Sequence, residues 1–145
     1  MRPYFHNYLL VISNYIAYKY LIILRIHRDD LKDFGAGHFA NVVKKVRKHH
    51  PDTLVEVLIP DFNAHEPSMR TLAESNPFVI AQNIETVKSL TRRVRDRRAG
   101  YEKTLSCLNF YKKNFPNIST KSSIMLGLGE KREEVIECLK DLRSV

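Results

Sequence analysis

Short apolar runs alternate with helical hydrophobic patterns along most of this chain. The apolar runs are short enough for buried strands, and they cover residues 20–26, 54–59, 78–81 and 124–126. The helical patterns between and after them cover residues 39–46, 69–73, 87–94, 101–115 and 133–142. Strands that alternate with helices predict an α/β fold, in which about four parallel strands are joined by right-handed crossovers and flanked by helices.

Each predicted strand is followed by polar residues or glycines. These strand ends are residues 27–30, 60–62, 82–86 and 127–130. The carboxyl ends of parallel strands meet at one edge of a sheet, where ligands bind in β/α barrels and open α/β sheets. We therefore expect one site assembled from four loops. The alternative is that Asp29, Asp61 and Glu130 only cap the helices that follow them.

The segment 119–130 is the most informative of these ends. A short apolar run meets the glycine-spaced turn Gly127-Leu128-Gly129, then Glu130, and a helical pattern begins at once. Glycines let a flat ligand group approach the backbone, and the start of a helix favours bound negative charge.

Composition indicates one small folded domain. The chain has 145 residues, of which 43% are hydrophobic and 28% charged. Its net charge is +8, with basic residues concentrated in 44–50, 92–98 and 112–113. We interpret these clusters as a solvated outer face and expect no nucleic-acid partner. A phosphate-binding role for 92–98, as in a basic nucleic-acid-binding module, is the alternative.

Cysteine and histidine usage favours a reducing compartment and no metal site of the chain's own. The two cysteines, Cys107 and Cys138, lie in helical patterns, and we expect both to be buried. The six histidines include no pair at helical ligand spacing with a carboxylate third. The apolar stretch 8–24 is interrupted by Ser13, Asn14 and Lys19, so we predict neither a membrane helix nor a signal peptide.

Several motifs together resemble lipoyl synthase, a radical S-adenosylmethionine (SAM) enzyme. They occur in the family's order and spacing at residues 28–31, 35–39, 56–62, 83–87, 94–99, 120–122 and 125–130. The resemblance covers residues 19–145, which we expect to form a partial radical SAM barrel domain. Residues 1–18 form a leader that is not like the family.

The resemblance implies a fold, an activity and partners. The family has a (β/α) barrel, often incomplete, with one 4Fe–4S cluster that splits SAM and an auxiliary cluster that donates sulfur. It inserts two sulfurs into an octanoyl group held on a lipoyl-carrier domain, which makes the family a sulfurtransferase. The implied partner is that octanoylated carrier domain. The implied location is the bacterial cytoplasm or the mitochondrial matrix.

The resemblance also implies cofactor-binding residues. Asn83 and Glu85 correspond to the polar pair that holds the ribose of SAM, and two such side chains in an extended segment point the same way. Met125, Gly127 and Gly129 belong to the stretch that lies against the adenine. Lys121 stands where a cation can meet the cofactor carboxylate.

The chain departs from the family where the clusters bind. The family's Cys-x3-Cys-x2-Cys motif and its auxiliary cysteines are absent from this sequence, which also stops before the later strands. Gln82 replaces a more usual His, and residues 24–27 read Leu-Arg-Ile-His in place of Thr-Ser-Val-Asp. Because thiolates ligate iron–sulfur clusters, the second hypothesis is a truncated remnant without activity. Missing strands would also leave the apolar side of residues 20–26 and the edge of residues 124–126 exposed.

Overall fold

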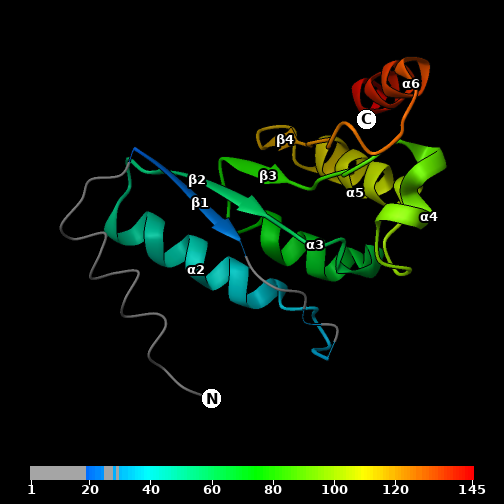
Figure 1. The fold of residues 1–145 in the computed structure, drawn as a ribbon. Helices are drawn as coiled ribbons and strands as arrows, with labels where there is room; N and C mark the ends of the chain where they lie inside the picture. Colours follow the sequence, from blue (N-terminus) through cyan, green and yellow to red (C-terminus); the bar gives the residue numbers. More distant parts are fainter. Residues whose placement is uncertain (1–18, 25–27, 29) are drawn as a thin grey trace.

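The computed structural model describes residues 19–24, 28 and 30–145. The leader predicted at 1–18 lies outside the described residues, as do residues 25–27 and 29 at the first strand end. Within the described part, a single sheet carries helices that follow its strands in turn (Figure 1).

The sheet has four parallel strands in the order β1-β2-β3-β4. Their bounds are Tyr20–Leu24, Leu54–Leu58, Val79–Ala81 and Ser119–Lys121. Each strand therefore pairs with the next strand along the chain. This sequential order is that of a barrel wall, whereas a doubly wound sheet reverses direction at a switch point. The predicted α/β fold with parallel strands is confirmed.

Three helices cover one face of this sheet: α2 (Ala36–His49), α3 (Glu66–Ala73) and α5 (Tyr101–Asn114). Alternate strand residues point toward them, because successive side chains of a strand face opposite sides. The first core joins the helices to these strands through Phe39, Val43, Val55, Val57, Met69, Leu72, Ile80, Cys107 and Tyr111.

The opposite face of the sheet is largely open. On β1, Leu21 and Ile23 pack against the first core, whereas Tyr20, Ile22 and Leu24 on the other face are 42%, 50% and 71% exposed. We call this side, with Glu56 of β2 and Lys121 of β4, the open face. In a complete β/α barrel, the face of the sheet opposite the helices is the inner side of the barrel wall. The prediction of exposed apolar strand surface is confirmed for β1.

A second core lies beyond the carboxyl end of β3. It joins the segment after β3 to α5 and α6 (Arg132–Ser144) through Ile84, Val87, Leu90, Tyr101 and Cys138. The predicted helix at 87–94 is a turn, η2 (Lys88–Leu90), followed by the four-residue helix α4 (Thr91–Val94). The hydroxyl of Tyr101 donates a hydrogen bond to Asp141 (2.9 Å), which ties α5 to α6.

The predicted position of the fourth strand was wrong. We expected it at 124–126, but β4 is the polar segment Ser119–Lys121, and Ile124 forms only an isolated bridge with Glu85. Ile124 is apolar because it packs against the second core. β4 lies at the edge of the sheet beside the open face, so its outward residues do not need to be hydrophobic.

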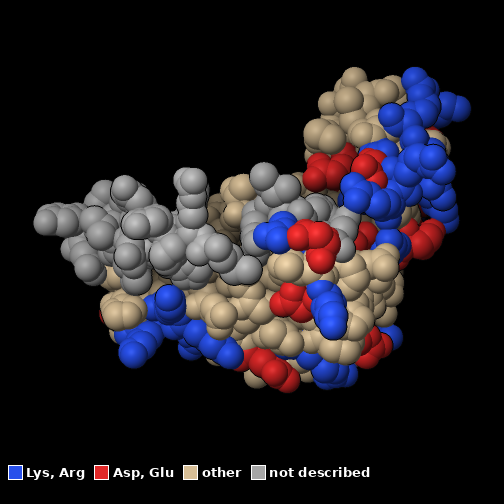
Figure 2. All heavy atoms as spheres, turned by 90° about the horizontal axis from the view of Figure 1, so that it is seen from below, with Lys and Arg blue, Asp and Glu red and all other residues tan. Residues whose placement is uncertain are grey.

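Basic residues and cysteines lie as expected from their patterns. Lys44, Lys45 and Lys48 are exposed on α2, and Figure 2 shows Lys and Arg side chains on the outer surface. Cys107 and Cys138 are free thiols, each 1% exposed, which confirms that both are buried. None of the helices in the described ranges is long and apolar enough to span a membrane.

Candidate functional site

A cavity of about 750 Å³ opens at the carboxyl edge of the sheet, and we call it the strand-end cavity. The last residues of β1 and β2, Leu24 and Leu58, form part of its wall, and the segment after β3 forms another part. The polar members of the lining are Asp61, Asn63, Gln82, Asn83, Glu85, Arg95, Asp96, Arg98 and Lys103. Its volume is in the range of small-molecule sites.

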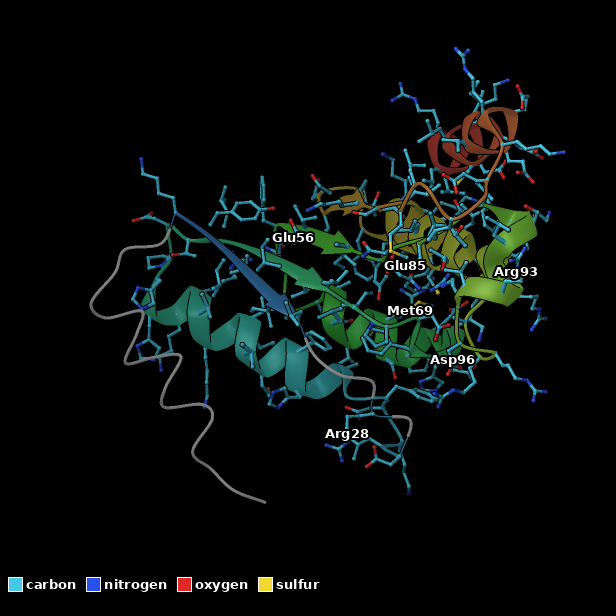
Figure 3. All side chains as sticks on the ribbon, in the orientation of Figure 1. Arg28, Glu56, Met69, Glu85, Arg93 and Asp96 are labelled. Carbon is cyan, nitrogen blue, oxygen red and sulfur yellow. The ribbon has the colours of Figure 1, made fainter. Side chains whose placement is uncertain are left out.

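Asn83 and Glu85 both contribute to the strand-end cavity. They are half-buried, whereas Ile84 between them is fully buried in the second core. The backbone of Glu85 is held on both sides, since its N–H donates to Ser123 (3.0 Å) and its carbonyl accepts from Met125 (2.8 Å). This pairing fixes an uncommon backbone φ of 65° at Glu85. Glu85 is labelled in Figure 3.

Gln82 is a lining residue of the cavity whose side chain holds a buried, unsatisfied acceptor. The residue is 3% exposed, and its Oε1 atom has no hydrogen-bond partner within the described part of the chain. A buried polar atom without a partner destabilises the fold by about 1–3 kcal/mol.

The end of β2 carries a strained turn next to the cavity. In η1 (Phe62–Ala64), three consecutive residues have positive φ values, 45°, 52° and 55°. Asp61 caps this turn by accepting from the N–H of Asn63 (2.8 Å), but capping is not its only role. Asp61 also lines the cavity and pairs with Lys103 at 3.4 Å. One carboxylate therefore serves both the turn and the cavity wall.

Cationic side chains from the segment 95–103 also line the cavity. Lys103 donates to the carbonyl of Arg98 (2.8 Å) and to Asn63 Oδ1 (3.2 Å). Arg95 donates to Thr104 Oγ1 at 3.0 Å. Because the same lining holds cations, carboxylates and amides, the cavity suits a ligand with both hydroxyl and anionic groups.

Lys121 lies on the open face and is absent from the described cavity lining. Its Nζ donates to Glu56 Oε1 at 2.8 Å, and Tyr20 donates to Glu56 Oε2 at 2.6 Å. Burial raises the pKa of Glu56, which is 3% exposed, but the bonds from Lys121 and Tyr20 outweigh burial and lower that pKa below its ordinary value. The same bond to Glu56 raises the pKa of Tyr20.

Met125, Gly127 and Gly129 belong to an exposed loop next to Glu85, and the described cavity lining includes none of them. The φ values of Gly127 and Gly129 are 91° and 105°, a region that favours glycine. Glu130 accepts from the N–H groups of Gly127 (2.5 Å) and Leu128 (2.8 Å), which lowers its pKa. Glu130 thus closes its own loop and does not cap α6.

The described residues do not provide ligands for an iron–sulfur cluster. No group of three or more His, Cys, Asp or Glu in residues 19–24, 28 and 30–145 could hold a metal ion. Cys107 lies in the first core and Cys138 in the second, and the Cys107 thiol donates to the carbonyl of Asp61. Burial, followed by the charge of Asp61, raises the pKa of Cys107 to about 12, so this thiol stays protonated.

One residue that sequence reasoning missed, Lys103, contributes to the site, together with Arg95, which the sequence marked only as part of the motif 94–99 and the basic cluster 92–98. Lys103 comes from the first turn of α5, and Arg95 from the loop before it. No strand-end pattern marks them, because their position depends on how the loop folds against Thr104. Asp61 and Gln82 belonged to the predicted polar strand ends.

A sequentially ordered parallel sheet, with helices on one face and a polar cavity at the carboxyl edge, is the arrangement of a segment of a β/α barrel. The model of the radical SAM superfamily matches residues 10–142, so the chain belongs to this superfamily.

Within the superfamily, the chain is similar to lipoyl synthases. It is 49% identical over 126 residues to lipoyl synthase of Thermus thermophilus, which covers 87% of this chain and 39% of that protein. It is also 49% identical over 127 residues to lipoyl synthase of Marinobacter nauticus, covering 88% of this chain and 36% of that protein. Over 125 residues it is 52% identical to the apicoplast lipoyl synthase of Toxoplasma gondii, covering 86% and 23% respectively. The chain thus spans about two fifths or less of these relatives.

Proposed function

We propose that this chain supplies the SAM-binding part of a lipoyl synthase. The observation that carries the proposal is the pair Asn83 and Glu85, which line one cavity at the carboxyl edge of a radical SAM barrel segment. Similarity to lipoyl synthases over most of the chain supports the particular reaction, the insertion of two sulfurs into a carrier-bound octanoyl group.

The proposed binding uses the polar groups after β3. The carboxylate of Glu85 accepts from ribose hydroxyls, and the Asn83 amide can both donate and accept. The loop at 125–129, hydrogen-bonded to Glu85, provides backbone groups for the adenine. These residues fit the nucleoside of SAM.

The proposal gives the described residues no part in cluster chemistry. A 4Fe–4S cluster supplies the electron that splits SAM, and thiolates must hold it. Cys107 and Cys138 are buried in separate cores and do not fit this task. The sulfur-insertion step therefore requires ligands other than these two residues. The proposed partner is an octanoylated lipoyl-carrier domain, in the bacterial cytoplasm or the mitochondrial matrix.

Equilibrium binding of SAM to the purified chain tests this proposal. Asn83→Ala and Glu85→Gln should each weaken binding by about tenfold, the equivalent of about 1.4 kcal/mol for one ligand hydrogen bond. Glu133→Gln, an exposed carboxylate in the first turn of α6, is the matched control and should leave affinity unchanged. Equal affinity in Glu85→Gln and wild type, or no binding at all, would contradict the proposal.

A further inference from the structure

The segment 91–98 carries five arginines beside the strand-end cavity. Arg95 and Arg98 contribute to the lining of the cavity. Arg92, Arg93 and Arg97 are exposed next to them, and we call these three the arginine rim. Figure 2 shows Lys and Arg side chains gathered on the side of the molecule that carries α4 and α6.

The backbone that carries the arginine rim is well anchored. Thr91 is buried and donates to the carbonyl of Val87 at 3.1 Å. Arg95 is bonded to Thr104, and the N–H of Arg98 donates to Asp96 Oδ1 at 2.9 Å. Lys103 holds the carbonyl of Arg98. A partner that binds here does not have to order the loop first, which lowers the entropic cost of association.

The rim arginines differ from their neighbours in having no carboxylate partner. Nearby, Lys88 pairs with Glu102 at 2.6 Å, and Lys103 pairs with Asp61 at 3.4 Å. Within the described part of the chain, none of the three rim arginines forms an ion pair. The side chain of Arg92 only donates to the carbonyl of Arg97, at 3.4 Å. Three like charges beside the cavity therefore have no ion-pair partner among the described residues.

We propose that the arginine rim docks an acidic protein surface, which presents its substrate-bearing side chain to the strand-end cavity. The inference rests on the proposed function and adds the chemistry of the partner. Opposite charge beside the cavity steers the partner and raises its association rate. The partner's carboxylates would neutralise Arg92, Arg93 and Arg97.

Two observations favour a protein over a nucleic acid. The rim is a short patch, and the basic residues next to it, Arg98 and Lys88, are already paired with Asp96 and Glu102, so no continuous basic stripe is left to follow a phosphate backbone. Sequence-independent binding of single strands also uses exposed aromatic rings. Among the described residues, the exposed aromatic rings Tyr20 and Phe78 pack on each other, 6.5 Å between centroids, at the open face of the sheet.

The test measures binding of an octanoylated lipoyl-carrier domain of net negative charge, as a function of salt. The triple variant Arg92→Ala, Arg93→Ala and Arg97→Ala is compared with Lys44→Ala, Lys45→Ala and Lys48→Ala on α2, which removes the same charge from exposed positions elsewhere. We expect the rim variant to bind about tenfold more weakly at low salt, with a flatter salt dependence. The α2 variant should stay within about twofold of wild type.

Three results would overturn the inference. The rim variant could bind the carrier as well as wild type, both triple variants could lose affinity equally, or wild type could fail to bind the carrier. If a single-stranded RNA oligonucleotide bound more tightly than the carrier through the same arginines, the nucleic-acid alternative would replace the inferred protein partner. SAM affinity of the rim variant is measured in parallel. If SAM binds while the carrier result is negative, the inference fails and the proposed function stands.

Discussion

Replacement of Lys121 by Met should destabilise the fold by about 2 kcal/mol near neutral pH. The change removes one of two hydrogen bonds to the Glu56 carboxylate, which is only 3% exposed. A charge-assisted hydrogen bond contributes about 1.5–3 kcal/mol, and breaking a fully buried pair costs about 3–5 kcal/mol. Because the Lys121 side chain is 49% exposed, we expect a loss of stability within the lower of these two ranges.

The pH dependence of this loss follows from the pKa of Glu56. In the wild-type fold this pKa lies below its ordinary value of 4.5, so the pair stabilises the protein above that pH. The contribution is lost as pH falls through the folded pKa. In Lys121→Met, burial of Glu56 remains without the cation, so its pKa should rise, and protonation should relieve the cost. The stability difference between the two proteins therefore shrinks as pH falls from about 7 to about 4.

Urea unfolding followed by circular dichroism measures both effects. With a typical slope of about 2 kcal/mol per molar urea, the midpoint for Lys121→Met should fall by about 1 M near neutral pH. The double variant Glu56→Gln with Lys121→Met should recover part of the loss, because no buried charge remains. A midpoint shift that is below about 0.25 M, or that grows as pH falls, would refute this reasoning.

Three further outcomes are expected. Gly127→Ala should cost about 1 kcal/mol in urea unfolding because its φ is 91°, and Gly127→Asn should cost less; equal costs would point to a lost contact. Iodoacetamide near pH 8 should leave Cys107 and Cys138 unmodified in the native protein and label both in urea, as mass spectrometry would show. After anaerobic incubation with iron, sulfide, reductant and SAM, the chain should produce no 5′-deoxyadenosine above a no-protein control; a signal abolished by Cys107→Ala would contradict the buried, protonated thiol.

The sequence predicted those elements whose hydrophobic pattern is determined by burial. β2 and α2 each present apolar residues to the first core, and their patterns gave bounds within a few residues of the structure. β4 could not be found in this way. Its residues Ser119 and Lys121 lie on the open face, so burial does not constrain them, whereas nearby Ile124 is apolar for a different packing reason.

The candidate site was only partly accessible from sequence. Asn83 and Glu85 were found because they directly follow a buried strand, and both line the strand-end cavity. Lys103 was not found, since its place depends on the fold of the loop before α5. The ion pair of Lys121 with Glu56 crosses the sheet between non-adjacent strands, a contact that no local pattern reveals. The roles of Lys121, Met125, Gly127 and Gly129 in cofactor binding stay predictions.

The most direct test of the central claim is chemical-shift mapping of the isotopically labelled chain during titration with SAM. The account predicts that backbone amides of residues 61–63 and 82–86 shift most, with smaller shifts at 125–129. Amides in the carboxyl-terminal half of α2, residues 43–49, lie on the helix-covered face away from the strand ends and should not move. Saturable shifts confined to α2 or to the open face near Tyr20, or no shifts at all, would contradict the claim that the strand-end cavity binds SAM.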